Sequence, residues 1–208
     1  MKKTLTRLPA AFFTFWLTLG ALAAPLRAIS VVPPTLTTLV GQSEEIVRAS
    51  VAEVESRWVE SRSGKQIIKT FVRLRIKETA KGPANEELTL SFFGGTVDGY
   101  TMAIAGMPTF RKGQQGWFFV KGNNRVICPL NFAHHGAYLL QAGPTAGSTQ
   151  VMRLNGAPLR STADIGDETD DHAAASSSFA ATAMTSDAFR AAITQELNRL
   201  GTTREVQP

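Results

Sequence analysis

The chain has 208 residues, a formal charge of +5 and 43% hydrophobic residues, with a single cysteine. That length can build one ordinary hydrophobic core, and one cysteine excludes an intramolecular disulfide, so the core has to provide the stability. The basic excess is concentrated at the N-terminus: four of the 22 basic residues lie before residue 29, which leaves 18 against 17 acidic residues. The rest of the chain is nearly neutral, which disfavours nucleic acid as a partner.

The first two dozen residues have the pattern of a secretory signal peptide. Three basic residues precede an uncharged apolar stretch over residues 8–24. Ala21 and Ala23 then place small residues at the two positions that a signal peptidase recognises. We predict a signal peptide over residues 1–23, with a cut after residue 28 as the alternative and an uncleaved anchor as the competing interpretation. Cleavage predicts an exported protein, periplasmic or extracellular, with no membrane span after processing.

A short helix and a long β-hairpin are expected next. Residues 35–50 predict a short helix that runs into a strand. In residues 66–78 apolar side chains alternate with mostly basic ones, which is the two-residue period of a half-buried strand. Residues 61–65 have the composition of a turn, so residues 47–59 should pair with 66–78 in an antiparallel hairpin.

The first strand of this hairpin should contain a β-bulge. Its apolar phase shifts between Val51 and Val54, as it does where one extra residue is inserted into a strand. Bulges help a sheet to curl. Further short strands are predicted over residues 87–93, 115–121, 125–130, 137–141 and 151–154. Five or six short strands with glycine-rich connections predict a mainly β fold, with a closed or partly closed antiparallel barrel.

Composition changes towards the C-terminus. Residues 161–184 contain small, polar and acidic residues with few large apolar side chains, which predicts a disordered linker. Apolar residues then recur at helical spacing, after a run of capping residues. We therefore predict a C-terminal amphipathic helix within residues 185–201, which docks either on the barrel or on a partner.

Several segments resemble a group of exported bacterial proteins of unknown function: KG at 81–82, LTLSFFGG at 88–95, GMPTFRKG at 106–113, CPL at 128–130 and GAY at 136–138. The layout of that group is similar, at a distance, to the OB-like barrel of netrin modules and tissue inhibitors of metalloproteinases. The resemblance implies an OB-like barrel domain over residues 29–160. Those inhibitors grip the zinc of their target with an N-terminal cysteine. Neither predicted cut exposes a cysteine here, so that mechanism is not implied.

Two sets of residues are candidates for ligand binding. OB-like barrels often bind polymers across a strand face through basic residues with an interleaved aromatic. The alternating strand carries such a stripe, namely Lys69, Phe71, Arg73, Arg75 and Lys77. Export favours an anionic polymer of the cell envelope or an acidic partner. The competing interpretation is a charged strand face that only keeps the protein in solution. The second set is Asp98 and Tyr100, in a glycine-rich loop.

Catalytic motifs are absent from the sequence. Cys128 could pair with His134 or His135 as a nucleophile and base, but it lies in an apolar run that favours a buried structural thiol. The adjacent histidines should point in opposite directions if the segment is extended, with one exposed and one packed, so we predict no metal site and no cofactor.

We therefore expect an exported, soluble, non-catalytic binding or interaction module. Its partner would be an unidentified protein or an anionic envelope polymer. One alternative is a companion or regulator of a secreted protease, and another is a small secreted enzyme that uses Cys128.

Overall fold

The computed structural model describes residues 33–61, 63–166 and 183–205. The predicted signal peptide, with Ala21 and Ala23, lies outside these residues, and so do residues 167–182 of the predicted linker. Within the described ranges, no helix has the length and apolar character needed to cross a membrane.

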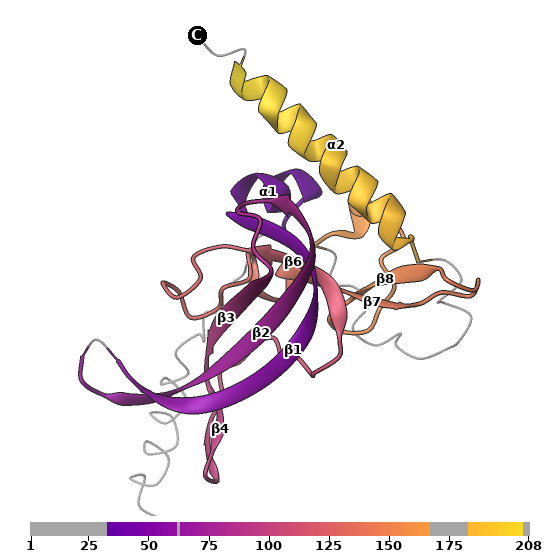
Figure 1. Cartoon of the computed structure of the whole chain (residues 1–208). Helices are drawn as coiled ribbons and strands as arrows, with labels where there is room; N and C mark the ends of the chain where they lie inside the picture. Colours follow the sequence, from indigo (N-terminus) through magenta and orange to yellow (C-terminus); the bar gives the residue numbers. More distant parts are fainter. Residues whose placement is uncertain (1–32, 62, 167–182, 206–208) are drawn as a thin grey trace, which may run out of the picture. The chain divides into compact units, whose positions relative to one another are not determined.

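The described chain is mainly β, as predicted, and contains a six-stranded antiparallel sheet, a short helix near the N-terminus and a C-terminal helix (Figure 1). Neighbouring strands follow the order β3-β2-β1-β6-β7-β8, and β4 pairs with β5 in a separate small hairpin. Along the chain the elements are α1 (Leu36–Gln42), β1 (Glu45–Glu60), β2 (Gln66–Lys81), β3 (Glu87–Phe93), β4 (Gly95–Val97), β5 (Tyr100–Met102), β6 (Gln115–Val120), η3 (Ala133–Gly136), β7 (Ala137–Ala142), β8 (Thr149–Arg153), η4 (Thr162–Asp164) and α2 (Ser186–Glu205).

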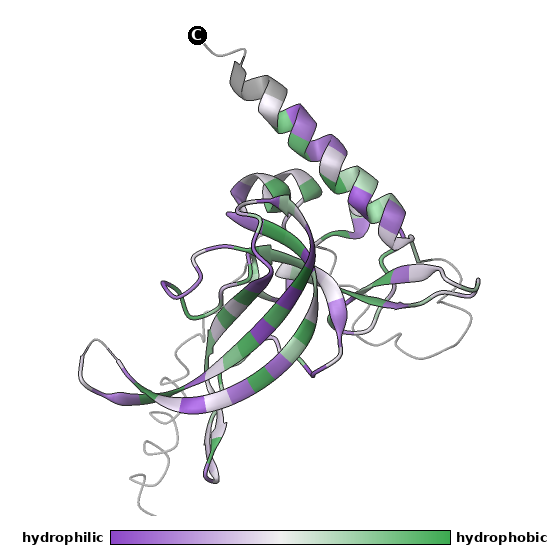
Figure 2. Ribbon diagram, in the orientation of Figure 1, coloured by the Kyte–Doolittle hydropathy of each residue, from purple (hydrophilic) through white to green (hydrophobic). Residues whose placement is uncertain are grey.

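Strands β1 and β2 form the predicted hairpin, with 16 residues in each strand. Both strands curve strongly (Figure 1), and hydrophilic and hydrophobic residues alternate along them (Figure 2). The predicted bulge is confirmed, because Val51 lies opposite Leu74 whereas Glu53 lies opposite Arg73. Ala52 is the extra residue. An insertion of this kind bends a strand and increases its twist, which accounts for part of the curvature.

Apolar side chains are buried on both sides of the sheet. On one side, which we call the inner face, Val72, Leu90 and Phe118 belong to a cluster built mainly by β1, β2, β3 and β6. On the other side of β6, Trp117 and Phe119 belong to a second cluster that includes residues of α1 and α2. Strand β6 is therefore buried on both faces, because its successive side chains alternate between the two clusters.

The C-terminal helix packs on this second cluster. Phe189 and Ile193 are fully buried. The Phe189 ring lies against Trp117, Phe119 and Tyr138, with centroid distances of 6.4, 6.2 and 5.1 Å. Of the two alternatives for this helix, the contacts show docking on the sheet.

Two predicted elements differ from the structure. The helix α1 is shorter than residues 35–50 suggested: the Ser43 hydroxyl donates a hydrogen bond to the Leu39 carbonyl at 2.6 Å, and the backbone is extended from there into β1. The predicted strand over residues 125–130 is wrong, since this segment forms turns and only Leu130 makes an isolated β-bridge. Asn124, at φ 63°, turns the chain in a left-handed conformation before this segment begins.

The turn segment after β6 covers one edge of the sheet instead. The Asn123 side chain accepts a hydrogen bond from the Ser91 backbone N–H at 3.2 Å and donates one to the Thr89 carbonyl at 2.8 Å. At the opposite edge, β8 bonds to the backbone of residues 157–159 and 184–185. Covered edges protect a sheet from pairing with other chains.

Candidate functional site

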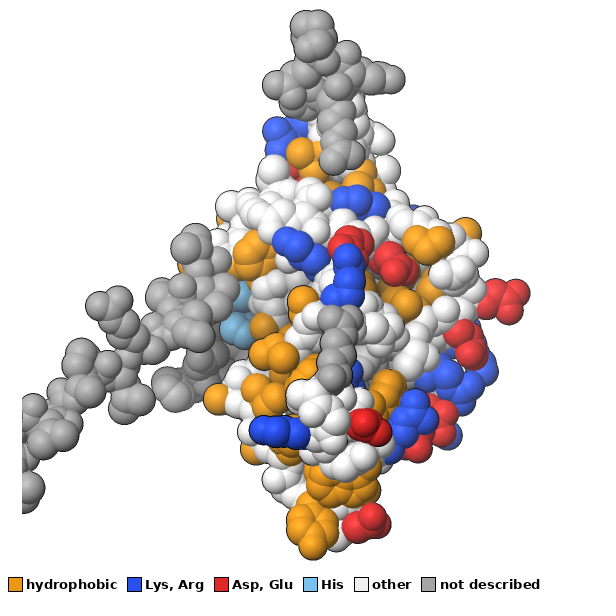
Figure 3. All heavy atoms as spheres, turned by 90° about the vertical axis from the view of Figure 1, so that its left-hand side faces the viewer, with side chains coloured by type: hydrophobic (Ala, Val, Ile, Leu, Met, Phe, Trp, Pro, Cys, Tyr) orange, Lys and Arg blue, Asp and Glu red, His pale blue; other side chains and the backbone are white. Residues whose placement is uncertain are grey.

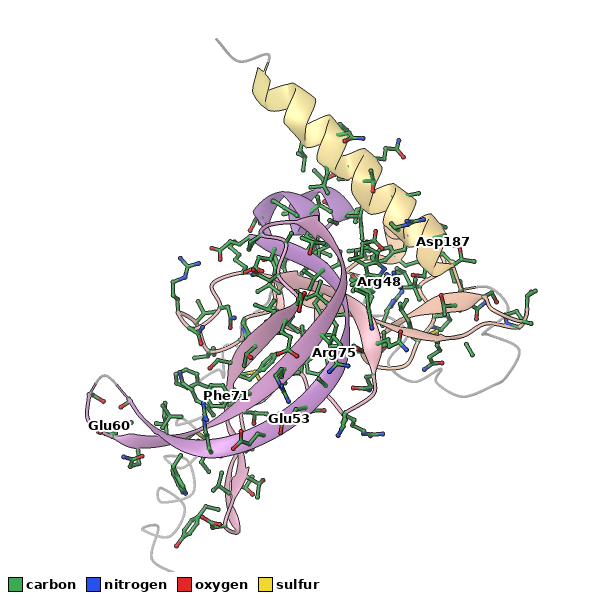
Figure 4. The ribbon with its side chains drawn as sticks, viewed as in Figure 1. Arg48, Glu53, Glu60, Phe71, Arg75 and Asp187 are labelled. Carbon is green, nitrogen blue, oxygen red and sulfur yellow. The ribbon has the colours of Figure 1, made fainter. Side chains whose placement is uncertain are left out.

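The five predicted ligand-binding residues of β2 share one face of the strand, as the alternation indicated. This outer face is the side opposite the inner-face cluster, and Figure 4 shows Phe71 and Arg75 along it. Arg73, Arg75 and Lys77 are exposed, whereas Lys69 and Phe71 are half-buried. The prediction of a shared face is therefore correct, and the charge of that face depends on its neighbours.

Carboxylates interrupt the basic stripe. The Arg73 guanidinium donates a hydrogen bond to Glu53 of β1 at 2.6 Å and lies 3.7 Å from a carboxylate oxygen of Glu87 in β3. Glu55 lies directly opposite Phe71 in the β1–β2 register. In Figure 3, acidic and basic side chains are intermingled on one flank of the molecule. The outer face is thus a surface of mixed charge.

The aromatic residue of the stripe is also covered. The Arg57 guanidinium lies 4.1 Å from the centroid of the Phe71 ring, and the Lys69 ammonium lies 4.7 Å from the Phe93 ring. These cation–π contacts occupy rings that a polymer would need for stacking. Sequence reasoning missed Arg57 because it treated β2 in isolation. Alignment of the hairpin about the turn at residues 61–65 would have placed Arg57 beside the stripe.

The other predicted pair, Asp98 and Tyr100, lies at the tip of the β4–β5 hairpin. Asp98 has φ 50° and Gly99 has φ 83°, which are the two consecutive left-handed residues of a tight hairpin turn. Tyr100 is 67% exposed, and its ring lies 6.0 Å from that of Trp58 at 62°. Trp58 lies opposite the buried Ile68, so this aromatic pair is on the inner side of the β1–β2 hairpin. The structure therefore does not bring Tyr100 together with the basic stripe.

The β4–β5 hairpin bends closely over the inner face. Ser56 and Thr70 share a hydrogen bond of 2.8 Å between their hydroxyls, and Thr70 donates a second one to the Gly94 carbonyl at 2.7 Å. A side chain at Gly95 would collide with both hydroxyls. Glycine at residue 95 is therefore what allows the hairpin to approach the strands.

Between this hairpin and the inner face lies a pocket of about 470 Å³, which we call the inner-face pocket. Its walls are mainly apolar, and they come from β1 to β5 and from the chain that follows β5. The apolar side chains that line it include Val54, Val72, Phe92, Met102, Ile104, Met107 and Phe110. Trp58 follows Ser56 on the same side of β1, so the exposed aromatic pair adjoins the pocket. This pocket was not predicted, because its walls come from five strands and a loop.

A second pocket, of about 480 Å³, contains both predicted histidines, and we call it the histidine pocket. His134 is exposed and His135 is 7% exposed, which confirms that one is exposed and one packed. The expectation that their side chains point apart is wrong: their rings lie 3.9 Å apart, because η3 is a 3₁₀-helix. Across the described residues, no three His, Cys, Asp or Glu side chains form a group that could hold a metal ion.

Cys128 is half-buried and packs against the inner-face cluster. Burial raises the pKa of its thiol, and a hydrogen bond with the Leu130 backbone only partly opposes this. A raised pKa keeps the sulfur protonated at neutral pH, which makes Cys128 a poor nucleophile. The neighbouring Val126 and Ile127 are 44% and 54% exposed, so the apolar run is less buried than its composition suggested.

No protein-family model matches this chain, and no curated protein is significantly similar to it. The chemistry of the exposed aromatic pair and of the two pockets is therefore the guide to function.

Proposed function

We propose that this protein is an exported, non-catalytic binding module that recognises a protein partner through the Trp58–Tyr100 pair and the inner-face pocket. Export is supported by the signal-peptide pattern over residues 1–23, with small residues at 21 and 23. The working compartment is then the periplasm or the medium. Measuring the intact mass of the exported protein tests this part, since cleavage after residue 23 predicts a chain that begins at Ala24.

The scaffold of this module is an OB-like barrel over residues 29–160. Support comes from the curved β1–β2 hairpin with its bulge and from the covered edge of β3. The chain that follows β6 returns to that edge, where the Phe93 backbone N–H donates a hydrogen bond to the Ile127 carbonyl at 2.9 Å. Closure of this kind would leave the inner face open only towards the β4–β5 hairpin.

The observation that carries the binding function is the exposure of two large aromatic side chains beside an apolar pocket. Trp58 is 41% exposed and Tyr100 is 67% exposed, in edge-to-face contact. Tryptophan and tyrosine are enriched among the residues that contribute most to protein–protein affinity, especially beside pockets that exclude water. Burial of this apolar surface would favour association by about 25 cal/mol per Å² before the costs of binding.

The charges around the pair indicate the chemistry of the partner. Glu60 lies two residues from Trp58 on β1, at the end of the hairpin (Figure 4), and Asp98 lies two residues from Tyr100. Both carboxylates are exposed. In Figure 3, hydrophobic side chains gather beside an acidic one at the lower end of the molecule. We infer a polypeptide segment with an apolar anchor for the pocket and a flanking Lys or Arg, which complements these carboxylates.

The outer face supports an anionic polymer less well. A polymer would have to displace Glu53 and Glu87 from Arg73 and compete with Arg57 for the Phe71 ring. The alternative of an enzyme that uses Cys128 is disfavoured by the raised pKa of its thiol. The Trp58–Tyr100 pair and the inner-face pocket therefore support recognition of a protein better than the outer face supports an anionic polymer or Cys128 supports catalysis.

The test is selection from a random peptide library displayed on phage, with the protein expressed from its full chain. We expect the selected peptides to combine an aromatic or aliphatic anchor with an adjacent basic residue. Synthetic copies of these peptides should lose at least tenfold in affinity for the double variant Trp58→Ala/Tyr100→Ala. Ile127→Ala is the matched control, because it also removes an exposed apolar side chain but one that does not line the pocket.

A second control addresses the outer face. Arg75→Glu/Lys77→Glu reverses two exposed charges of the stripe and should leave peptide affinity within twofold. Peptides without a shared pattern, or peptides that bind the aromatic double variant as well as the wild type, would contradict a binding role for the pair. Loss of affinity in the charge-reversed variant alone would instead assign binding to the outer face.

A further inference from the structure

The histidine pocket concentrates polar and ionisable side chains from separate parts of the fold. Tyr138 of β7 and Arg153 of β8 lie directly opposite each other in the sheet and are 2% and 8% exposed. His134 and His135 come from η3, and Asp164 is the last residue of η4. The loop at residues 106–109 forms another wall. A volume near 480 Å³ is in the range of sites that bind small molecules.

The backbone that presents the histidines is held in an unusual conformation. Phe132 and Ala133 are consecutive non-glycine residues in the left-handed region, with φ 56° and 53°. Asn131, just before them, donates side-chain hydrogen bonds to the Leu39 carbonyl at 3.2 Å and to the Ser43 hydroxyl at 3.1 Å. Left-handed residues of this kind persist where the surroundings fix them, and they are frequent at ligand sites.

Close backbone packing and a hydrogen bond also fix the end of η3. A side chain at Gly136 would collide with the Asn131 backbone. The His135 backbone N–H donates a hydrogen bond to the Phe132 carbonyl at 3.1 Å. The two imidazoles are thus held side by side on a rigid support, which is how binding groups are pre-organised.

The charges of the lining favour an anion over a cation. Arg153 is a permanent cation, and its charge acts on the Tyr138 phenol, where it opposes the increase in pKa that burial causes. The imidazoles can donate hydrogen bonds and can become cations. Among the described residues, Asp164 is the one acidic side chain that lines the pocket. Its carboxylate accepts three hydrogen bonds of 3.0–3.1 Å, from the backbone N–H groups of Arg160 and Ser161 and from the Ser161 hydroxyl.

We propose that the histidine pocket binds a small oxyanion, a carboxylate or phosphate group, through Arg153 and the imidazoles of His134 and His135. The planar guanidinium can form two parallel hydrogen bonds to such a group. The imidazole N–H groups supply further donors, and Tyr138 borders the same space. The two pockets share the wall formed by residues 107–109, but Arg153, His134 and His135 line the histidine pocket and not the inner-face pocket. The proposed anion site therefore does not depend on whether the protein binds a peptide.

Calorimetric titration of the protein, expressed from its full chain, with inorganic phosphate and with succinate tests this site and separates the two oxyanions. We expect one of them to bind and to shift the imidazole resonances in the NMR spectrum. Affinity should fall about tenfold in Arg153→Gln, which loses charge-assisted hydrogen bonds. Arg75→Gln makes the same substitution on the outer face and should bind like the wild type.

Arg153 is buried, so the thermal unfolding of its variant has to be measured alongside binding. His134 is exposed, and His134→Gln should fold normally while binding severalfold more weakly, which keeps the test decisive if Arg153→Gln does not fold. Absence of heat and of imidazole shifts with both anions would overturn the assignment. So would an equal loss in Arg75→Gln, or imidazole shifts with Zn²⁺ alone, which would indicate a metal site.

Discussion

Phe189 is the largest side chain that the C-terminal helix buries in the second cluster, so its replacement by alanine is a direct test of this packing. Phe189 is fully buried and contacts three aromatic rings, from Trp117, Phe119 and Tyr138. Truncation to alanine would remove the whole ring from the cluster between α2 and the sheet. It would also leave a cavity, because the three neighbouring rings belong to rigid strands of the sheet.

The expected loss follows from this burial. Replacement of a buried phenylalanine by alanine lowers the free energy of unfolding by about 3–5 kcal/mol, and the three ring contacts place Phe189→Ala towards the upper part of that range. Domains have a total of roughly 5–15 kcal/mol, so about 4 kcal/mol is a large fraction. At roughly 2–4 °C per kcal/mol for a chain of this size, Tm should fall by about 8–16 °C.

Urea denaturation and thermal unfolding, both followed by circular dichroism, measure the loss. Gln195→Ala is the control, since Gln195 lies on the exposed face of the same helix and alanine is a good helix former. It should change the free energy of unfolding by less than about 0.5 kcal/mol. A loss below about 1 kcal/mol in Phe189→Ala would refute the docking of α2 as a stabilising contact.

Two further outcomes follow from local contacts. Gly95→Ala should lower the free energy of unfolding by about 2 kcal/mol or more, because its new methyl group collides with two hydroxyls. Gly99→Ala, also at positive φ but in open space, should lower it by only about 1 kcal/mol. Equal losses in urea denaturation would argue against the close approach of the β4–β5 hairpin. Cys128 should react slowly with iodoacetamide at pH 7.5 and faster as the pH rises, since burial raises the pKa of its thiol; alkylation in the native protein as fast as in urea would contradict that burial.

The sequence alone determined the helices and strands in which apolar residues recur with a regular period over many consecutive residues. The alternation over residues 66–78 identified β2, and the phase shift between Val51 and Val54 predicted the bulge that the structure places at Ala52. Helical spacing from Phe189 onwards identified α2. These features depend on neighbours within a few residues, because side-chain direction repeats every two residues in a strand and about every 3.6 residues in a helix.

The predicted strand at 125–130 shows where local composition misleads. The apolar run there has the composition of a buried strand, yet Val126 and Ile127 are exposed, because the segment follows a left-handed turn and covers the edge of β3. Composition alone cannot distinguish a segment that forms a regular β-strand from one that only makes isolated backbone hydrogen bonds to the edge of a sheet.

Most of what defines the candidate sites was decided by tertiary structure. The basic stripe on β2 was visible in the sequence, but its carboxylate neighbours Glu53 and Glu87 lie on two other strands, and only the register brings them to Arg73. The partner of Tyr100 is Trp58, 42 residues earlier in the chain. Arg153 joins the histidines only because β7 and β8 pair and η3 precedes them. Sequence determines which side chains share a face of one element, whereas the pairing of distant elements decides which charges and rings meet, and binding depends on that meeting.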